Sequence, residues 1–250
     1  MTDLTGKVGL VTGASQGIGA GIARVMATYG ADIAVNYLRS EELAQQVCEE
    51  IRALGRNAHL IKADVMDFQA VQDMVAEAED NLGPIDILVN NAGHNPLHNI
   101  MEIEEDDWDW VLNLNLKAYY RCSKAVLPGM LARQEGRIIN ITSISGQRGG
   151  FSCDVDYSAA KAGINGFTRA LARWAAPRGV LVNAVAPGYI ETQMLGGEIS
   201  PVLAMLLESV PLKRQGTPEE IGEVVAFLAG PGATYIVGEV ISVNGGVHIA

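Results

Sequence analysis

The fold of this chain is decided by residues 7–19, which read KVGLVTGASQGIG. Residues 7–12 form a short apolar run typical of a buried β-strand, and a turn with three glycines follows it. Residues 17–29 have the pattern of a helix that ends before Gly30. A strand, a glycine-rich turn and a helix in this order predict the first unit of a parallel α/β fold.

The same alternation of short apolar runs and amphipathic stretches continues to the end of the chain. Further strands are expected at residues 32–36, 59–63, 85–89, 137–141, 181–185 and 239–243. Long helices are expected at residues 40–54, 104–133 and 157–176, and another begins at Asp67. We therefore predict that residues 1–250 form one doubly wound, Rossmann-type domain, with a mostly parallel sheet of about seven strands and helices on both faces. Ligands of such a domain bind beyond the carboxyl ends of the strands, near the switch point.

Composition excludes several classes of partner. The 250 residues carry a formal net charge of −11, which disfavours binding to nucleic acid or to anionic lipid. No segment approaches 18 uninterrupted apolar residues and the N-terminus does not resemble a signal peptide, so we expect no membrane partner and a cytoplasmic location. Cys48, Cys122 and Cys153 are widely spaced, which fits buried thiols better than a disulfide framework or a zinc site.

No metal site is expected. Residues 102–109 contain six carboxylates, and we interpret them as the solvated start of a helix, where negative charge suits the helix dipole. The four histidines, His59, His94, His98 and His248, have no spacing typical of metal ligands.

The glycine turn has a chemical interpretation. Glycines allow the backbone to approach a pyrophosphate closely, and the N-terminus of the following helix offers unpaired N–H groups to it. The spacing from Gly13 to Gly19 is G-x-x-x-G-x-G, and its place between the first strand and the first helix favours a nucleotide over an ordinary tight turn.

A second motif, Tyr157-Ser158-Ala159-Ala160-Lys161, points to proton transfer. Positions i and i+4 share one face of a helix, so the phenol and the ammonium are neighbours. Reduction of a ketone needs a proton as the hydride arrives. A phenol keeps its proton at neutral pH, and a nearby cation is expected to lower its pKa toward the range useful for acid–base catalysis.

Together these motifs resemble those of the short-chain dehydrogenase/reductase family. The resemblance covers essentially the whole chain, with T-G-x-x-x-G-x-G at residues 12–19, N-N-A-G at residues 90–93 and Y-x-x-x-K at residues 157–161. It implies an NAD(P)-dependent oxidoreductase in which the tyrosine is the acid/base and the lysine holds the nicotinamide ribose. It also implies that Ser143 binds the substrate oxygen and that Asn115 supports a proton-relay water. The loop before Tyr157 is one residue longer than is usual, so Ser145 stays open as an alternative to Ser143.

The end of the second expected strand bears on the coenzyme. Tyr37 stands where NAD enzymes usually have an acidic residue, and Arg39 is a natural partner for the 2′-phosphate of NADP. Glu41 and Glu42 dilute the positive charge of Arg39. We therefore expect NADP(H), with NAD(H) as the alternative. The resemblance and these patterns give as cofactor-binding residues Gly13, Ser15, Gln16, Gly17, Ile18, Gly19, Tyr37, Arg39, Ser40, Asp64, Val65, Asn91, Ala92, Gly93, Tyr157, Lys161, Pro187, Gly188, Ile190 and Thr192.

Within the family, the length and the ending Val243-Asn244-Gly245-Gly246 are closest in pattern to the 3-oxoacyl-[acyl-carrier-protein] reductases. Arg178 matches one carrier-binding position of these enzymes, whereas Gln134 departs from the other. The substrate is thus expected to be a small or carrier-bound ketone. A sugar, polyol or other small secondary-alcohol dehydrogenase is the alternative, and a non-catalytic dinucleotide-binding regulator is the rival of another class. The apolar helices at residues 108–131 and 157–174 favour a homo-oligomer, and the resemblance implies a tetramer.

Overall fold

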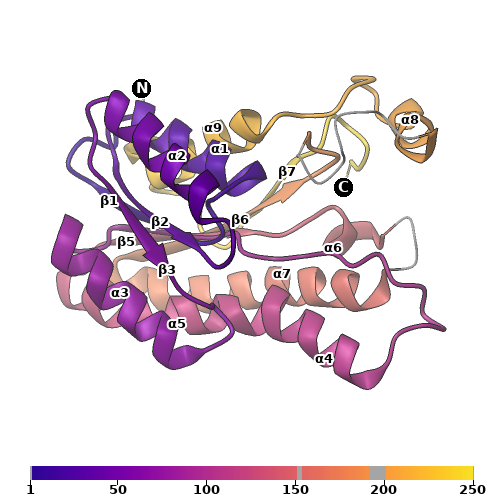
Figure 1. Cartoon of the computed structure of the whole chain (residues 1–250), viewed down its shortest axis with the longest axis horizontal. Helices are drawn as coiled ribbons and strands as arrows, with labels where there is room; N and C mark the ends of the chain where they lie inside the picture. Colours follow the sequence, from indigo (N-terminus) through magenta and orange to yellow (C-terminus); the bar gives the residue numbers. More distant parts are fainter. Residues whose placement is uncertain (1, 151–153, 192–200, 250) are drawn as a thin grey trace.

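A seven-stranded parallel sheet forms the centre of the structure (Figure 1). The structure is a computed structural model that describes residues 2–150, 154–191 and 201–249. In space the strands run in the order β3-β2-β1-β4-β5-β6-β7. Their bounds are β1 Val8–Val11, β2 Asp32–Tyr37, β3 Ala58–Lys62, β4 Ile87–Asn90, β5 Gly136–Ile141, β6 Val180–Pro187 and β7 Val240–Val243.

Helices cover both faces of the sheet (Figure 1). One face carries α1 (Gly17–Thr28), α2 (Glu41–Ala53) and α9 (Pro218–Ala229). The other face carries α3 (Phe68–Leu82), α4 (Glu105–Leu112), α5 (Ala118–Arg133) and α7 (Val155–Ala175). The short helices α6 (Ser145–Arg148) and α8 (Pro201–Glu208) lie toward the end of the sheet where β7 points. The prediction of a doubly wound α/β domain is therefore confirmed.

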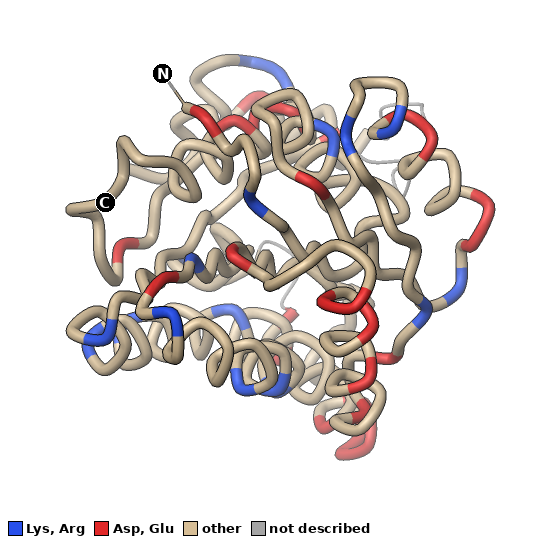
Figure 2. Tube along the Cα trace, turned by 90° about the vertical axis from the view of Figure 1, so that its left-hand side faces the viewer, with Lys and Arg blue, Asp and Glu red and all other residues tan. Residues whose placement is uncertain are grey.

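Successive residues of each strand supply two separate cores. Leu10 packs with α3, α5 and α7, whereas its neighbour Val11 packs with α1, α2 and α9. Leu88 and Val89 of β4 divide in the same way. This follows from the two-residue period of a strand, and it explains why the strands read as continuous apolar runs. Charged residues lie mainly on the outer helices and loops (Figure 2).

The chain reverses its direction of winding between β1 and β4, which are adjacent although 75 residues separate Val11 from Ile87. The loops that leave the two strands therefore diverge to opposite faces of the sheet. Such a switch point leaves a crevice at the carboxyl edge of a parallel sheet. All the predicted catalytic groups belong to segments that end at this edge or pack against it.

The helix expected over residues 104–133 is continuous in the structure, but it is not α-helical throughout. The structure has α4, then a π-helical turn at Asn113–Lys117, then α5. The side chain of Asn115 donates to the carbonyl of Val111 at 3.1 Å, and so occupies the acceptor that an α-helical N–H of residue 115 would use. The carboxylates of Glu104 and Asp107 cap α4 reciprocally, which confirms the acidic stretch as a helix start.

Two further observations concern the chain as a whole. No helix in the described part of the chain is long and apolar enough to cross a membrane. Cys48 and Cys122 are free, buried thiols, as expected, and Cys153 lies outside the described residues.

Candidate active site

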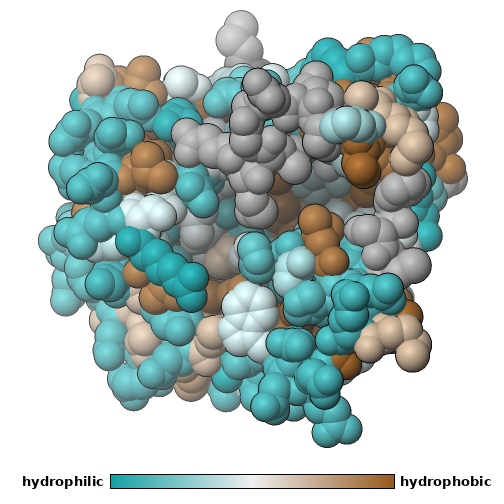
Figure 3. All heavy atoms as spheres, turned by 45° about the vertical axis from the view of Figure 1, so that its right-hand side comes forward, coloured by the Kyte–Doolittle hydropathy of each residue, from teal (hydrophilic) through white to brown (hydrophobic). Residues whose placement is uncertain are grey.

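A cavity of about 450 Å³ opens at the carboxyl edge of the sheet. The residues that line it come from the turns after β1, β2, β4, β5 and β6 and from the start of α7. The side of the molecule where these segments end is turned forward in Figure 3, and its described surface is mostly hydrophilic with separate apolar patches. Of the predicted residues, the lining includes Gly13, Ser15, Gln16, Gly17, Ile18, Gly19, Tyr37, Arg39, Ser40, Asn91, Ala92, Gly93, Ser143, Tyr157, Lys161, Pro187 and Gly188.

The glycine turn is shaped to hold a phosphate group. Gly13 and Gly17 have φ angles of 63° and 56°, a left-handed conformation that favours glycine. A Cβ at Gly19 would lie 2.4 Å from the carbonyl oxygen of Gly13, so a side chain there would close the turn. The N-cap residue of α1, Gln16, makes no side-chain cap, and the first turn of α1 has no acidic residue. The N–H groups at this helix end are therefore available to an anion.

Hydrogen bonds fix the glycine turn to the neighbouring strands. The amide of Asn91 donates to the carbonyl of Thr12 at 2.9 Å, and the backbone N–H of Asn91 donates to the hydroxyl of Thr12 at 2.9 Å. From the other side, Gly13 N–H donates to Oδ1 of Asn36 at 3.1 Å. The N-N-A-G segment therefore supports the turn as well as lining the cavity. Asn36 is a supporting residue that sequence reasoning missed, because its side chain lies inside a strand read as apolar.

The end of β2 presents a cation to the cavity. Arg39 is exposed, and no ion pair of its guanidinium is found in the part of the chain that the structure describes. Tyr37 is buried, and burial together with a hydrogen bond to Glu41 raises the pKa of its phenol. Glu41 thus engages Tyr37, which leaves Arg39 as the charged group beside this part of the lining.

Tyr157 and Lys161 face each other across one turn of α7. The ammonium nitrogen of Lys161 lies 5.5 Å from the centre of the Tyr157 ring. Lys161 is only 3% exposed, and its Nζ donates to the carbonyl of Ile141 at 2.9 Å and to the hydroxyl of Tyr119 at 3.0 Å. Tyr119 in turn donates to the carbonyl of Ile141 at 2.8 Å. Tyr119 lies on α5, far from Lys161 in the sequence, and it belongs to none of the motifs identified in the sequence.

Burial shifts the pKa values of both groups away from their usual ranges. Burial raises the pKa of Tyr157 to about 12, against a hydrogen bond with Ser143 that lowers it, while the charge of Asp154 raises it further. Burial lowers the pKa of Lys161 to about 7. The expectation that Lys161 lowers the pKa of the phenol below its usual range therefore differs from the structure. The reason is that the low-dielectric surroundings penalise the charged form of each residue.

Ser143 is the second residue after the end of β5, and it lies in the cavity lining together with Tyr157. Ser145, the alternative, begins α6, and its backbone N–H donates to the hydroxyl oxygen of Ser143 at 3.0 Å. Ser145 is not among the described lining residues, and it orients Ser143 through this bond. The geometry thus favours Ser143 as the residue that meets a bound carbonyl group.

Asn115 is completely buried in the π-helical turn. Its Nδ2 donates to the carbonyls of His94 and Val111, and its Oδ1 accepts from the N–H of His94 at 3.1 Å. A Cβ at Gly93 would lie 2.6 Å from this oxygen, so a glycine is needed there. Asn115 therefore joins the helical bend to the loop after β4 and is not itself a lining residue of the cavity.

Some predicted residues lie elsewhere. Asp64 and Val65 follow β3 at the same edge, but they do not line the cavity, and the carboxylate of Asp64 accepts from Met66 N–H. Ile190 is buried beside a neighbouring pocket, and Thr192 lies outside the described residues. Sequence reasoning missed the lining residues Leu38, His94, Asn95, Leu114, Ile141 and Thr142. Leu38, His94 and Thr142 each adjoin a predicted residue near a strand end, which is the signal that could have found these three.

The cavity has the donors of a dinucleotide site rather than those of a metal site. Within residues 2–150, 154–191 and 201–249, no three His, Cys, Asp or Glu side chains form a group that could hold a metal ion. The glycine turn fits a pyrophosphate, because its N–H groups are open and a side chain at Gly19 would fill the cradle.

Known proteins resemble this chain over nearly its whole length. A family model described as Enoyl-(Acyl carrier protein) reductase matches residues 13–248. The 3-oxoacyl-[acyl-carrier-protein] reductase FabG of Staphylococcus epidermidis is 43% identical over 243 residues, which cover 97% of this chain and 99% of that protein. The enzyme of the same name from Vibrio harveyi is 43% identical over 247 residues, which cover 99% of each chain.

Solved structures agree with this assignment. A short chain dehydrogenase from Burkholderia cenocepacia J2315 in complex with NADP matches with a TM-score of 0.90 and 37% identity, and the match covers 98% of each chain. A variant of a Serratia marcescens short-chain dehydrogenase/reductase matches with a TM-score of 0.91, 37% identity and the same coverage. The chain belongs to the short-chain dehydrogenase/reductase family and is an NAD(P)-dependent oxidoreductase that acts on CH–OH and C=O groups.

Proposed function

We propose that this enzyme uses NADPH to reduce the ketone of a 3-oxoacyl thioester to a secondary alcohol. The observation that carries the proposal is one cavity that brings together Tyr157, Lys161 and Ser143 with an uncapped glycine turn. Relatives that are 43% identical over nearly the whole chain carry the name 3-oxoacyl-[acyl-carrier-protein] reductase.

In this proposal each polar group of the cavity has a separate task. Tyr157, whose raised pKa keeps the phenol protonated at neutral pH, donates the proton to the carbonyl oxygen of the substrate. Ser143 donates a hydrogen bond to the same oxygen and so orients the carbonyl group. The bound nicotinamide supplies the hydride. Lys161, held by Tyr119 and Ile141, is placed to bind the ribose hydroxyls.

The coenzyme is held by the remaining lining residues. The turn from Gly13 to Gly19 receives the pyrophosphate, and Arg39 with Ser15 and Ser40 receives the 2′-phosphate that distinguishes NADPH from NADH. Support for NADPH comes from the unpaired Arg39 and from the NADP complex of the Burkholderia cenocepacia relative. Asn115 acts through the loop after β4 in this scheme, because the structure shows its amide hydrogens engaged by backbone carbonyls.

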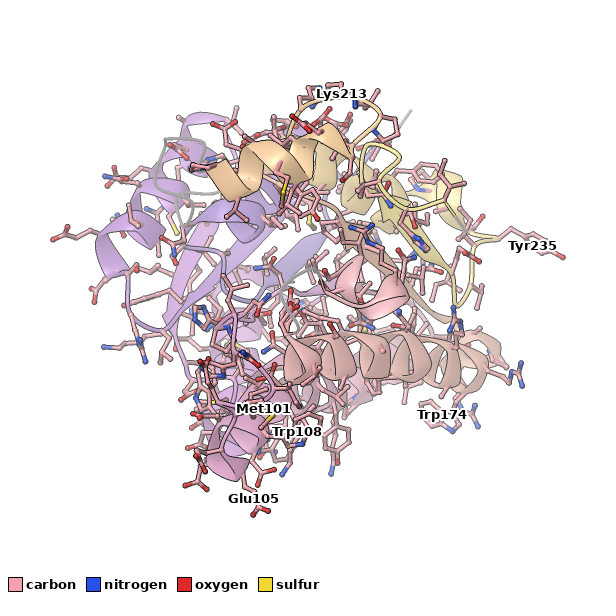
Figure 4. All side chains as sticks on the ribbon, turned by 90° about the vertical axis from the view of Figure 1, so that its right-hand side faces the viewer. Met101, Glu105, Trp108, Trp174, Lys213 and Tyr235 are labelled. Carbon is pink, nitrogen blue, oxygen red and sulfur yellow. The ribbon has the colours of Figure 1, made fainter. Side chains whose placement is uncertain are left out.

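Charge around the cavity favours a second candidate, a small ketone or polyol that is not bound to a carrier. The loop that lines the cavity leads past Met101 to the acidic first turn of α4, which begins at Glu105, and Trp108 follows in the same helix (Figure 4). Arg178, the one matching carrier-binding residue, stacks on Trp174 at 4.5 Å and donates to its carbonyl. An acidic carrier protein that approaches the cavity past this acidic turn would gain little electrostatic attraction. A cytoplasmic location and a tetrameric assembly stay predictions.

Tyr157→Phe tests the proposed reaction. The variant keeps the ring and the cavity but removes the proton donor, so we expect normal NADPH binding and a loss of turnover of at least about a hundredfold. With acetoacetyl thioester as the substrate, the oxidation of NADPH is followed. With a panel of sugars and polyols, the reduction of NADP is followed instead. Near-normal turnover by the variant would reject the role of Tyr157, and activity on the polyols alone would select the second candidate.

A further inference from the structure

Two buried carboxylates stand at the start of α7, and their partners differ. Asp156 is completely buried; its Oδ1 accepts from the N–H of Tyr157 at 2.7 Å, and its Oδ2 lies 3.7 Å from Nδ1 of His98. Asp154 is 2% exposed, and its Oδ2 accepts from Nδ2 of Asn95 at 2.7 Å. Its other oxygen, Oδ1, has no hydrogen-bond partner in the described structure.

The carboxylate of Asp154 takes part in none of the ion pairs found in the described part of the chain. The N-terminus of α7 stabilises negative charge at this position, but a buried carboxylate with one amide donor remains costly.

The carboxylate of Asp154 is held rigidly. A Cβ at Gly150 would lie 1.6 Å from its Oδ1, so the group rests directly on the backbone there. Asn95, which lines the cavity, holds the opposite oxygen and takes the N–H of Leu97 on its own Oδ1 at 3.0 Å. The charge therefore has one position, and it lies at the boundary between the loop after β4 and the first turn of α7.

Asp154 is the N-cap residue of α7, and Tyr157 is the third residue of the helix, so both belong to the N-terminal end of α7. The negative charge disfavours a second negative charge on the phenol, and accordingly Asp154 raises the pKa of Tyr157 beyond the effect of burial. Ser143 acts in the opposite direction through its hydrogen bond.

The other ionisable groups around Tyr157 do not duplicate this effect. On α7, Lys161 lies over the ring, and burial lowers its pKa to about 7. From α5, Tyr119 presents a hydroxyl that is engaged by Lys161. From the loop after β4, His94 lines the cavity with its ring against Trp110. Asp156 is directed to His98 and to the backbone of α7.

We propose that Asp154 is a positioning residue that acts through Tyr157: its fixed negative charge keeps the phenol in the proton-donating form and extends reduction to higher pH. The proposal rests on the proposed role of Tyr157 as the proton donor. It assigns a task to a buried carboxylate for which the amide of Asn95 is the one hydrogen-bond donor found within residues 2–150, 154–191 and 201–249.

Two variants separate the charge of Asp154 from its hydrogen bond. Asp154→Asn removes the charge and keeps an oxygen that accepts from Asn95. Asn95→Ala removes the hydrogen bond and keeps the charge. The alkaline fall of kcat/KM for ketone reduction is measured for both over the pH range in which the protein stays folded. Tyrosinate absorbance is titrated in parallel, as the difference between each protein and its Tyr157→Phe counterpart.

We expect Asp154→Asn to move the alkaline inflections of kcat/KM and of the tyrosinate absorbance to lower pH by about one unit, the order of the effect that a single nearby charge has on a buried group. Asn95→Ala is expected to raise KM and to leave the inflections unmoved. Unmoved inflections in Asp154→Asn, or equal movement in both variants, would overturn the proposal. If Asp154→Asn does not fold, Asp154→Ser provides the same test. Turnover by Tyr157→Phe would instead reject the proposed proton donor, so the two failures are distinguishable.

Discussion

Gly19→Ala tests whether the coenzyme cradle depends on the absence of a side chain. The added Cβ would lie 2.4 Å from the oxygen of Gly13 and 2.5 Å from Nδ2 of Asn91, whereas ordinary contact begins at 3.4 Å. The backbone of the turn would therefore have to retreat by about 1 Å, and such overpacking costs about 1–3 kcal/mol. The better helix propensity of alanine returns at most about 1 kcal/mol.

We expect a net loss of about 1–2 kcal/mol in the free energy of unfolding, and each kcal/mol lowers the Tm of a protein of this size by about 2–4 °C. The affinity for NADPH should fall as well, because the N–H groups of the turn are displaced. Urea unfolding and titration calorimetry measure the two effects. Gly166→Ala is the matched control, since its Cβ would meet nothing within 4 Å inside α7, and it should stabilise the protein by about 0.5–1 kcal/mol. Gly19→Ala with unchanged stability and NADPH affinity would refute the reasoning.

Three further predictions concern the cavity. Arg39→Ala should raise the KM for NADPH by about tenfold or more while the KM for NADH changes little, because one charge-assisted contact is lost. The half-buried Arg24, which is paired with Glu50, gives the control Arg24→Ala, and equal effects of Arg39→Ala on both coenzymes would remove the assignment. Ser143→Ala should lower kcat by about a hundredfold and Ser145→Ala far less, because Ser143 meets the carbonyl oxygen; the reverse order in steady-state kinetics would favour Ser145. Lys161→Met should lose stability relative to the wild type as the pH rises from about 7 toward 10. Urea unfolding at several pH values measures this. A difference in the free energy of unfolding that stays constant over this range would contradict the lowered pKa of Lys161.

The sign of the last prediction follows from proton binding. The unfolded chain keeps Lys161 protonated up to its usual pKa of 10.5, whereas the folded protein releases the proton at about 7. Between these values the unfolded state binds more protons, so the wild type gains stability with rising pH. Lys161→Met lacks this group and gains nothing. Below about pH 7 both states of the wild type are protonated and the difference is constant.

Much of the fold could be predicted because the signals are local. The strands are short and mostly apolar runs, and glycine, asparagine or serine follows within two residues of the end of β1, β4, β5, β6 and β7. The glycine turn after β1 predicts where a nucleotide binds. The π-helical turn could not be predicted, because it depends on Asn115 meeting His94 from a loop some twenty residues away. Tyr119 could not be predicted for the same reason, because only the folded structure brings its hydroxyl into contact with Lys161.

The direction in which the pKa values of Tyr157 and Lys161 shift could not be predicted from the sequence either. Spacing places Tyr157 one turn from Lys161 and suggests that the cation lowers the pKa of the phenol, but burial is a property of the whole fold. Once both groups are buried, the pKa of Tyr157 rises to about 12 and that of Lys161 falls to about 7, so the ammonium loses its proton long before the phenol does. An inflection near pH 7 in the coenzyme affinity of the free enzyme would therefore belong to Lys161. Tyr157→Phe should retain this inflection and Lys161→Met should lose it, and the opposite result would mean that the phenol, not the amine, titrates first.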